Sequence, residues 1–467
     1  MSNSRVRPAM AVLGLVIWGL VGCGQTGMME AMGKVREQML RGNNAAALGV
    51  LREARKNKAF KEQDRVMFWM EEGMLLFLTR DYQKSTDVME KCEQRTKELY
   101  TKSISKGIKA AFTSDAATDY KGESYENILL NVFKAMSFLA MKKPDAAMVE
   151  ARKINEKLAW YNTIYKGKNT YNQDAFAHWL TGVLYEMEGS LDDARISYVK
   201  AYKTYNGPFA ANYGMGAPSY LKEDIVRVAT RNNSMEAIAE IRNQLGPDLG
   251  KTAQLVGSKG ELIVFHLNGE GPSKTDYFVT CTFRSVAAWR CDGEPGGEFI
   301  RKTTLTIAPK ADVVKVAFPR LITRQPHNRQ VFIAAGDQRT LTEKAYPLNA
   351  IAQKALRDKA GLIFKDAVIR GITKFLTAKA AGAIGKQVGG GLFGALAKIG
   401  TSVAMQATEE ADKRAWTTLP AEINIGRVWL EPGEHTVYLA LPDGRVALPK
   451  VKIEAGKRVF LAMRTLP

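Results

Sequence analysis

Few residues in this chain have the types and spacing that chemistry requires. Residues 246–252, Gly-Pro-Asp-Leu-Gly-Lys-Thr, come near a phosphate-binding loop, but their glycines are one residue too close and a helical pattern precedes them. The histidines, His178, His266, His327 and His435, lack the spacing of metal ligands, and no nucleophile motif is present. The sequence therefore predicts no catalytic residues, no cofactor and no metal site, and it favours a binding protein over an enzyme.

The four cysteines fall into three different settings. Cys281 and Cys291 lie ten residues apart in a strand-like region, and this spacing alone is compatible either with a disulfide or with two free thiols. Cys92 lies in a helical pattern, which favours a small buried packing residue. The fourth, Cys23, follows an apolar run near the start of the chain.

Residues 1–22 have the features of an export signal. A basic segment, 1–7, precedes an uncharged run, 8–22, which is shorter than the ~20 residues of a membrane-spanning helix. Leu-Val-Gly-Cys, ending at Cys23, resembles the bacterial lipobox, which implies cleavage before Cys23 and a lipid on its thiol. Gly24 follows where inner-membrane lipoproteins carry aspartate, so the resemblance implies a periplasm-facing protein of the outer membrane. The alternative is an ordinary signal or anchor with an incidental cysteine.

The composition is that of a globular protein with two or three domains. The chain has 467 residues, of which 46% are apolar and 25% charged, and its net charge is +19. A basic surface of this kind suits anionic lipid, an acidic glycan or an acidic protein, although it also suits a surface that contacts only solvent. An exported chain without a nucleic-acid-binding motif is not expected to bind nucleic acid.

Residues 23–250 carry a helical pattern with repeats of the tetratricopeptide type. In the best repeat, Gly182 and Ala194 occupy the positions where the two helices of a pair approach most closely, and Tyr198 fills the space beside them. Three weaker repeats precede it, which is enough to stack a continuous core. We therefore expect a helical solenoid over this half of the chain, with a helical array of another kind as the alternative.

The period changes in the second half. Short β-rich runs bounded by turn residues predict a β domain over 255–347, and alternating strands over 413–467 are expected to complete it. Pro432-Gly433 and Asp443-Gly444 predict hairpin turns. The fold class is therefore α+β: a tetratricopeptide-like α-solenoid followed by a β-sandwich-like domain with a helical insertion.

The insertion, residues 348–412, is basic and rich in glycine and alanine. Its centre contains six lysines and arginines against one acidic residue, Asp366, and its apolar residues keep a helical spacing. The pattern is compatible with an amphipathic segment on a membrane surface. It is also compatible with a helix packed on the rest of the protein, which we favour.

Several blocks of this sequence resemble a family of uncharacterised bacterial outer-membrane lipoproteins with tetratricopeptide-like repeats. The blocks are YKGESYENILLNVFKAMSFLA, DAFAHWLTGVLYEMEGSLDDARISYVKAY, GELIVFHLNGEGP, VAFPRL and WTTLPAEINIGRVWLEPGEHTV. The family brings no catalytic residues. It is associated with envelope lipoproteins that regulate peptidoglycan synthases, so the resemblance implies a role in cell-envelope or peptidoglycan assembly.

Two functions follow. The first is a lipid-anchored periplasmic scaffold or adaptor, which binds an envelope protein or peptide through the groove face of its repeats. The residues expected on that face are Asn131, Lys134, Asp174 and His178. The alternative is a glycan-binding or glycan-acting envelope protein, for which peptidoglycan is the expected partner. Its aromatic contacts would be Trp160, Tyr161, Tyr165, Tyr171 and Tyr213.

Overall fold

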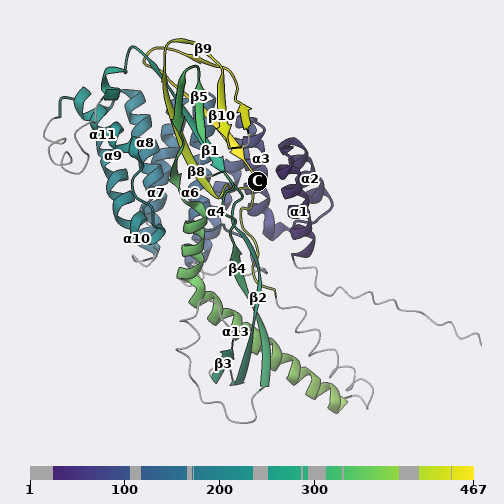
Figure 1. The fold of residues 1–467 in the computed structure, drawn as a ribbon. Coiled ribbons are helices and arrows are strands. Elements are labelled where there is room, and N and C mark those ends of the chain that lie inside the picture. Colours follow the sequence, from purple (N-terminus) through teal and green to yellow (C-terminus); the bar gives the residue numbers. More distant parts are fainter. Residues whose placement is uncertain are drawn as a thin grey trace, which may run out of the picture.

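The structure is a computed structural model. The structure describes residues 25–105, 117–165, 171, 173–234, 251–285, 288–292, 312–328, 331–388, 410–442 and 444–467. Cys23, the end of the expected helical domain at 235–250 and Asp443 lie outside the described residues. The fold is α+β, with a helical first half followed by sheets (Figure 1).

The helical half consists of helices that follow one another as antiparallel pairs. The pairs are α1 (Thr26–Leu40) with α2 (Asn44–Lys56), α3 (Arg65–Leu78) with α4 (Tyr82–Ser105), α6 (Ser124–Ala140) with α7 (Pro144–Tyr165), and α8 (Ala175–Glu188) with α9 (Leu191–Thr204). The remaining helical elements are η1 (Glu62–Asp64), η2 (Tyr205–Phe209), α10 (Ala210–Tyr213), α11 (Ser219–Arg231) and η3 (Lys251–Gln254).

Individual residues explain where helix α8 begins, where it ends and where it contacts α9. The Asp174 carboxylate accepts the backbone N–H of Ala177 at 2.8 Å and caps the start of α8. Gly189 ends α8 with φ of +85°, a conformation that glycine adopts without strain. A Cβ at Gly182 would lie 2.5 Å from the Tyr198 ring, so the two helices meet where the repeat spacing predicts.

The strands form four hydrogen-bonded groups. Their orders are β13-β1-β8-β7, β11-β10-β5-β6, β12-β9 and β3-β2-β4. The strands are β1 (Gly260–Asn268), β2 (Ser273–Ser285), β3 (Ala288–Asp292), β4 (Asp312–Ile322), β5 (Phe332–Ala335), β6 (Gln338–Leu341), β7 (Glu343–Tyr346), β8 (Glu422–Leu430), β9 (Gly433–His435), β10 (Val437–Leu441), β11 (Gly444–Ala447), β12 (Val451–Ile453) and β13 (Arg458–Thr465).

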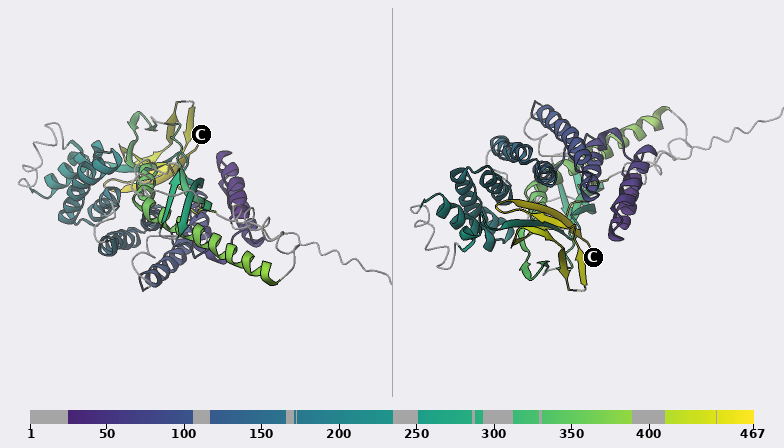
Figure 2. Two further views of the ribbon diagram at one scale, coloured as in Figure 1. Left: turned by 90° about the horizontal axis from the view of Figure 1, so that it is seen from below. Right: turned by 90° about the horizontal axis from the view of Figure 1, so that it is seen from above.

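Strand β1 lies between two cores. Leu262 and Val264 face the sheet that contains β5 and β10, whereas Ile263 and Phe265 face the helices. All nine residues of β1 are buried, because alternate side chains point to opposite faces of a strand and both faces are covered. The helices curve around this sheet (Figure 2). The expected β domain therefore shares one hydrophobic core with the helical array and is not an independent unit.

A long arm extends away from this body (Figure 1). It consists of the ribbon β3-β2-β4 and the helix α13 (Leu348–Val388). Phe364, Val368 and Ile372 of α13 pack on the ribbon, and a disulfide joins Cys281 to Cys291 across β2 and β3. In the described part of the insertion, the helix thus packs against the protein's own strands. No described helix is long and apolar enough to cross a membrane.

One of the two expected hairpins is wrong. Strand β8 ends before Pro432 and β9 begins at Gly433, but β8 pairs with β1 and β7 while β9 pairs with β12. The turn therefore carries the chain from one sheet to another. The second turn does join an antiparallel pair, β10 and β11, in which Leu441 lies opposite Gly444.

Candidate functional site

The inner face of the helical array is filled by the protein's own chain. Residues 410–421 run without helix or strand along α3 and α6. The Glu71 carboxylate accepts four hydrogen bonds from Thr417 and Thr418, at 2.5–3.0 Å, through their backbone N–H groups and hydroxyls. The Trp416 ring is fully buried and packs edge-on against Phe133. The face on which we expected a partner is therefore occupied within the chain.

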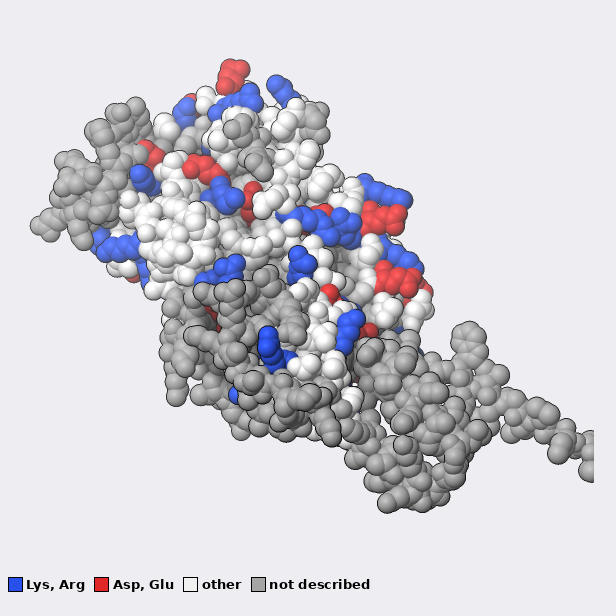
Figure 3. All heavy atoms as spheres, turned by 60° about the horizontal axis from the view of Figure 1, so that its bottom comes forward, with Lys and Arg blue, Asp and Glu red and all other residues white. Residues whose placement is uncertain are grey.

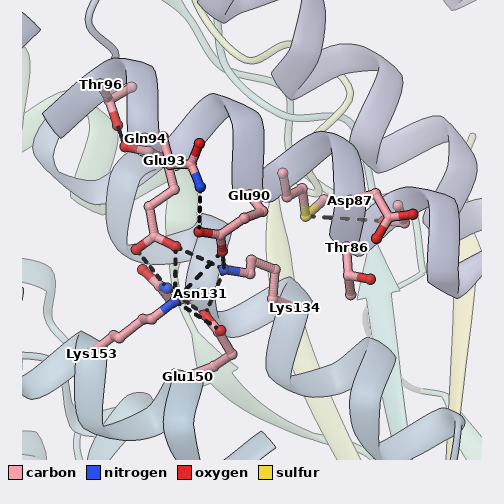
Figure 4. Close-up of polar contacts among 12 residues, drawn as sticks. Thr86, Asp87, Glu90, Glu93, Gln94, Thr96, Asn131, Lys134, Glu150 and Lys153 are labelled. Atoms are coloured by element: carbon pink, nitrogen blue, oxygen red, sulfur yellow. Dashed lines mark hydrogen bonds and ion pairs between the residues drawn. The ribbon is translucent and has the colours of Figure 1, made fainter. Parts of the chain in front are cut away.

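Asn131 and Lys134 belong to a buried polar cluster between α4, α6 and α7 (Figure 4). The Lys134 ammonium lies 2.5 Å from Glu90, 2.7 Å from Glu93 and 2.9 Å from Glu150. The Asn131 amide donates to Glu93 at 3.0 Å and to Glu150 at 2.6 Å. The polar groups of both side chains are therefore paired with other residues of the helical array.

The electrostatics of this cluster hold its charges in place. Burial opposes the charge on Lys134, but the carboxylates of Glu93 and Glu150 outweigh it and raise the lysine pKa above its usual value. Burial likewise opposes ionisation of Glu93, and the ammonium groups of Lys157 and Lys134 outweigh it, so the pKa of Glu93 is lowered. The cluster is therefore a set of fixed charges that join three helices.

The other two expected site residues are buried as well. Asp174 caps α8 and accepts the Tyr171 hydroxyl, while burial raises the pKa of Asp174 to about 6. His178 is buried, and burial together with nearby Lys200 lowers its pKa to about 3, so the ring is neutral at pH 7. The expectation that Asn131, Lys134, Asp174 and His178 form an exposed partner-binding face is corrected by this burial. The physical reason is that the sheet and the neighbouring helices cover the inner helices.

A cleft of about 670 Å³ opens elsewhere, between the ends of the helix pairs and the sheets. Its walls come from the α6–α7 turn, the α8–α9 turn, the end of α11 and strands β1, β8, β12 and β13. Trp429 and Phe460 provide apolar wall. The rim carries exposed side chains of both charges, namely Lys142, Lys452, Lys457, Asp145, Glu188 and Glu454. This cleft is the candidate functional site.

Charged side chains form the floor of the cleft and continue behind it. The members are Arg227, Arg231, Arg427, Arg458, Glu186, Asp224 and Glu261. Arg458 lies 2.8 Å from Glu186 and 2.7 Å from Glu261, and so links the helical array to strand β1. With four guanidinium groups and three carboxylates, this arginine network carries one positive charge in excess.

Two carboxylates of the network, Glu186 and Glu261, are ionised. Burial raises the pKa of Glu261, but Arg427 and Arg458 outweigh it and bring the pKa to about 2. For Glu186, Arg458 and Arg227 likewise outweigh burial and lower the pKa. Nη1 of the fully buried Arg227 has no hydrogen-bond partner among the described residues. This donor lies behind the floor, because Arg227 does not line the cleft.

Sequence reasoning missed the arginine network. Glu186 and Arg227 lie 41 residues apart, and Glu261 and Arg427 lie 166 apart. No motif relates them, so the only signal in the sequence was the presence of charged residues within otherwise apolar segments such as GELIVFHLN and INIGRVWL.

A second cavity, of about 460 Å³, lies between α4 and α7. Trp160 lines it and is 37% exposed, beside the edge-on rings of Tyr100 and Tyr161. Of the other aromatic residues expected to bind glycan, Tyr171 is buried and the side chain of Tyr165 lies outside the described residues. The aromatic residues therefore do not form one continuous surface.

The chain matches no protein-family model and no curated protein sequence. Among solved structures it is similar to a MamA RS-1 double mutant, with 15% identity, a TM-score of 0.30, and coverage of 47% of this chain and 92% of that chain. It is also similar to MamA 41-end from Desulfovibrio magneticus RS-1, with 15% identity, a TM-score of 0.29, and coverage of 47% of this chain and 93% of that chain. A third similar structure is the Rap conjugation gene regulator of plasmid pLS20 in complex with the Phr* peptide, with 15% identity, a TM-score of 0.28, and coverage of 50% of this chain and 60% of that chain. Likenesses at these TM-scores establish no function, and membership of the lipoprotein family stays a prediction.

Proposed function

We propose that this protein is a lipid-anchored periplasmic scaffold that binds an envelope protein through the cleft. The observation that carries the proposal is the cleft itself, whose 670 Å³ lies within the range of about 300–1,000 Å³ of small-molecule pockets and would admit side chains from a short segment of a partner. Apolar wall and a charged floor supply both contact area and orientation. The protein would act by binding and not by catalysis.

The cleft is lined by equal numbers of basic and acidic side chains, the acidic ones including Asp145, Glu188 and Glu454, so an anionic group is expected to bind at the arginine network and not across the whole cleft. One positive charge in the arginine network has no carboxylate of its own, and Arg231, at 30% side-chain exposure, is the arginine most accessible from the cleft. A carboxylate from a partner would complete the network through charge-assisted hydrogen bonds. The partner is therefore expected to insert an acidic side chain or a chain-terminal carboxylate.

The start of the described chain supports a short tether. Gln25 is buried, donates to the Asp412 carboxylate at 3.4 Å and accepts the backbone N–H of Lys413 at 3.1 Å. Cys23 lies two residues earlier, and two residues span at most about 7 Å. A lipid on Cys23 would thus hold the folded body directly at the outer membrane, as the sequence predicts.

The test is photo-crosslinking in cells from a photoreactive residue placed at Lys457, on the cleft rim. The matched control places the same residue at Lys200, which is also an exposed lysine but lies on the outer side of α9. We expect one recurrent envelope protein to be captured from position 457 and not from position 200. Equal capture at both positions, or no protein at 457, would contradict the proposal.

A second candidate function is glycan binding, which the half-exposed Trp160 at the 460 Å³ cavity favours. It requires saturable sedimentation of the protein with purified peptidoglycan. It also requires that Trp160→Ala weakens this binding, whereas Trp289→Ala, on the arm, leaves it unchanged. Binding that fails to saturate would exclude this candidate and leave the scaffold.

A further inference from the structure

The arm begins at the point where the anchor would emerge. Gln25 contacts Asp412 and Lys413, and the Lys413 ammonium lies 2.7 Å from Asp276 on strand β2. The first described residue and the base of the arm are therefore neighbours. The arm extends from this end of the body, away from the helix pairs (Figure 1). A lipid on Cys23 would then place the arm next to the bilayer.

One face of the ribbon is packed and the other is open. Val279, Cys281 and Val316 point toward α13 and are buried. On the opposite face Phe278 is 44% exposed and Val313 is 55% exposed, because side chains alternate along each strand. Two large apolar side chains are thus exposed on one face of the ribbon, while the other face packs against α13.

A basic group lies beside one of these apolar side chains. The Lys315 ammonium lies 4.7 Å from the centre of the Phe278 ring. The helix α13, which packs on the opposite face of the ribbon, is also basic, with eight lysines and arginines against two aspartates. Seen from the arm end, the lysine and arginine side chains of the described surface lie together with aspartate and glutamate side chains (Figure 3). An exposed aromatic ring with lysine beside it is the composition of a membrane-interface contact.

We propose that the open face of the ribbon, Phe278, Val313 and Lys315, rests on the anionic headgroup region of the membrane that holds the lipid anchor. The contact would orient the body so that the cleft faces away from the bilayer or along it, and not into it. This inference rests on the proposed lipid anchor. It adds a second, protein-encoded contact to a single lipid attachment, and attraction of a lysine to anionic lipid strengthens that contact.

The experiment places a photoreactive phenylalanine analogue at Phe278 in the full chain and irradiates intact cells. The matched control places it at Ile196 on α9, which has the same 55% exposure as Val313 but lies on the helical array. Phospholipid adducts are then measured by mass spectrometry. We expect at least tenfold more phospholipid adduct at position 278 than at 196. The additional change Lys315→Glu is expected to lower the yield at 278 about fivefold.

A protein adduct at 278, or equal lipid yields at both positions, would overturn the inference. The mass of the N-terminal peptide from the same sample reports whether Cys23 carries lipid, which separates the two proposals. If that peptide carries no lipid, the anchor fails, and the arm is judged by flotation of the same chain with anionic vesicles. Flotation that Lys315→Glu weakens would sustain the membrane contact, and absence of flotation would reject it.

Discussion

Glu71 provides a sharp test of how the inner face of the array is filled. Its carboxylate is fully buried, and burial raises its pKa to about 7 from an ordinary value of 4.5. Between these two pH values the folded protein binds a proton that the unfolded chain does not bind. The stability contributed by this group is therefore present below pH 4.5 and is lost as the pH rises through 7.

The magnitude follows from the size of the shift. A shift of about 2.5 pH units corresponds to roughly 3 kcal/mol, of which about 2–3 kcal/mol falls between pH 5 and pH 8. Glu71→Gln removes the titration. At pH 5 the variant also loses part of the contact with Thr417 and Thr418, because an amide N–H₂ replaces one acceptor oxygen, at a cost of about 1–2 kcal/mol.

The assay is urea unfolding of the wild type and Glu71→Gln at pH 5 and at pH 8. We expect the free energy of unfolding of the wild type to fall by about 2–3 kcal/mol relative to the variant on going from pH 5 to pH 8, so that the variant is the more stable of the two at pH 8. Glu72→Gln is the matched control, because Glu72 pairs instead with Arg52 at 2.7 Å. If the difference between wild type and Glu71→Gln were the same at both pH values, Glu71 would not be buried against residues 410–421.

Two further predictions concern packing and the arm. Gly182→Ala is expected to destabilise the protein by about 1–3 kcal/mol, because the new Cβ would meet the Tyr198 ring. Gly33→Ala is expected to stabilise the protein by about 0.5–1 kcal/mol, because a Cβ there would have nothing within 4 Å. Chemical denaturation of both variants measures the two effects, and equal effects would contradict the helix contact. Replacing Cys281 and Cys291 with serine is expected to cost about 2–3 kcal/mol in the stability of the arm, measured as increased hydrogen exchange of β2 and β4, and unchanged exchange would show that the disulfide does not form.

The helical pairs were predictable because their signals are local. Gly182 and Tyr198 are sixteen residues apart, and their spacing alone indicates two helices that approach closely. The strand pattern of β1 was visible for the same reason. What could not be seen is that β1 has a second buried face, since Ile263 and Phe265 need helices from a distant part of the chain to cover them.

The site was less accessible to sequence reasoning. Lys134 was expected on the groove face of the repeats, but its partner Glu93 lies 41 residues away and compensates its charge inside the array. The cleft depends in the same way on Arg458, which brings Glu186 and Glu261 together from separate halves of the chain. Pairings between distant charges leave no periodic pattern, so the structure was required to find them.

The most direct test of the central claim is the crosslinking yield from position 457 in cells when the excess charge of the arginine network is removed. Arg231→Gln removes that charge while Glu186 keeps Arg227 and Arg458. The control, Arg195→Gln, removes an arginine of similar exposure on α9. We expect Arg231→Gln to lower partner capture about tenfold, because a charged hydrogen bond is lost, and Arg195→Gln to leave it unchanged. Equal capture in the two variants would show that the cleft floor does not bind the partner.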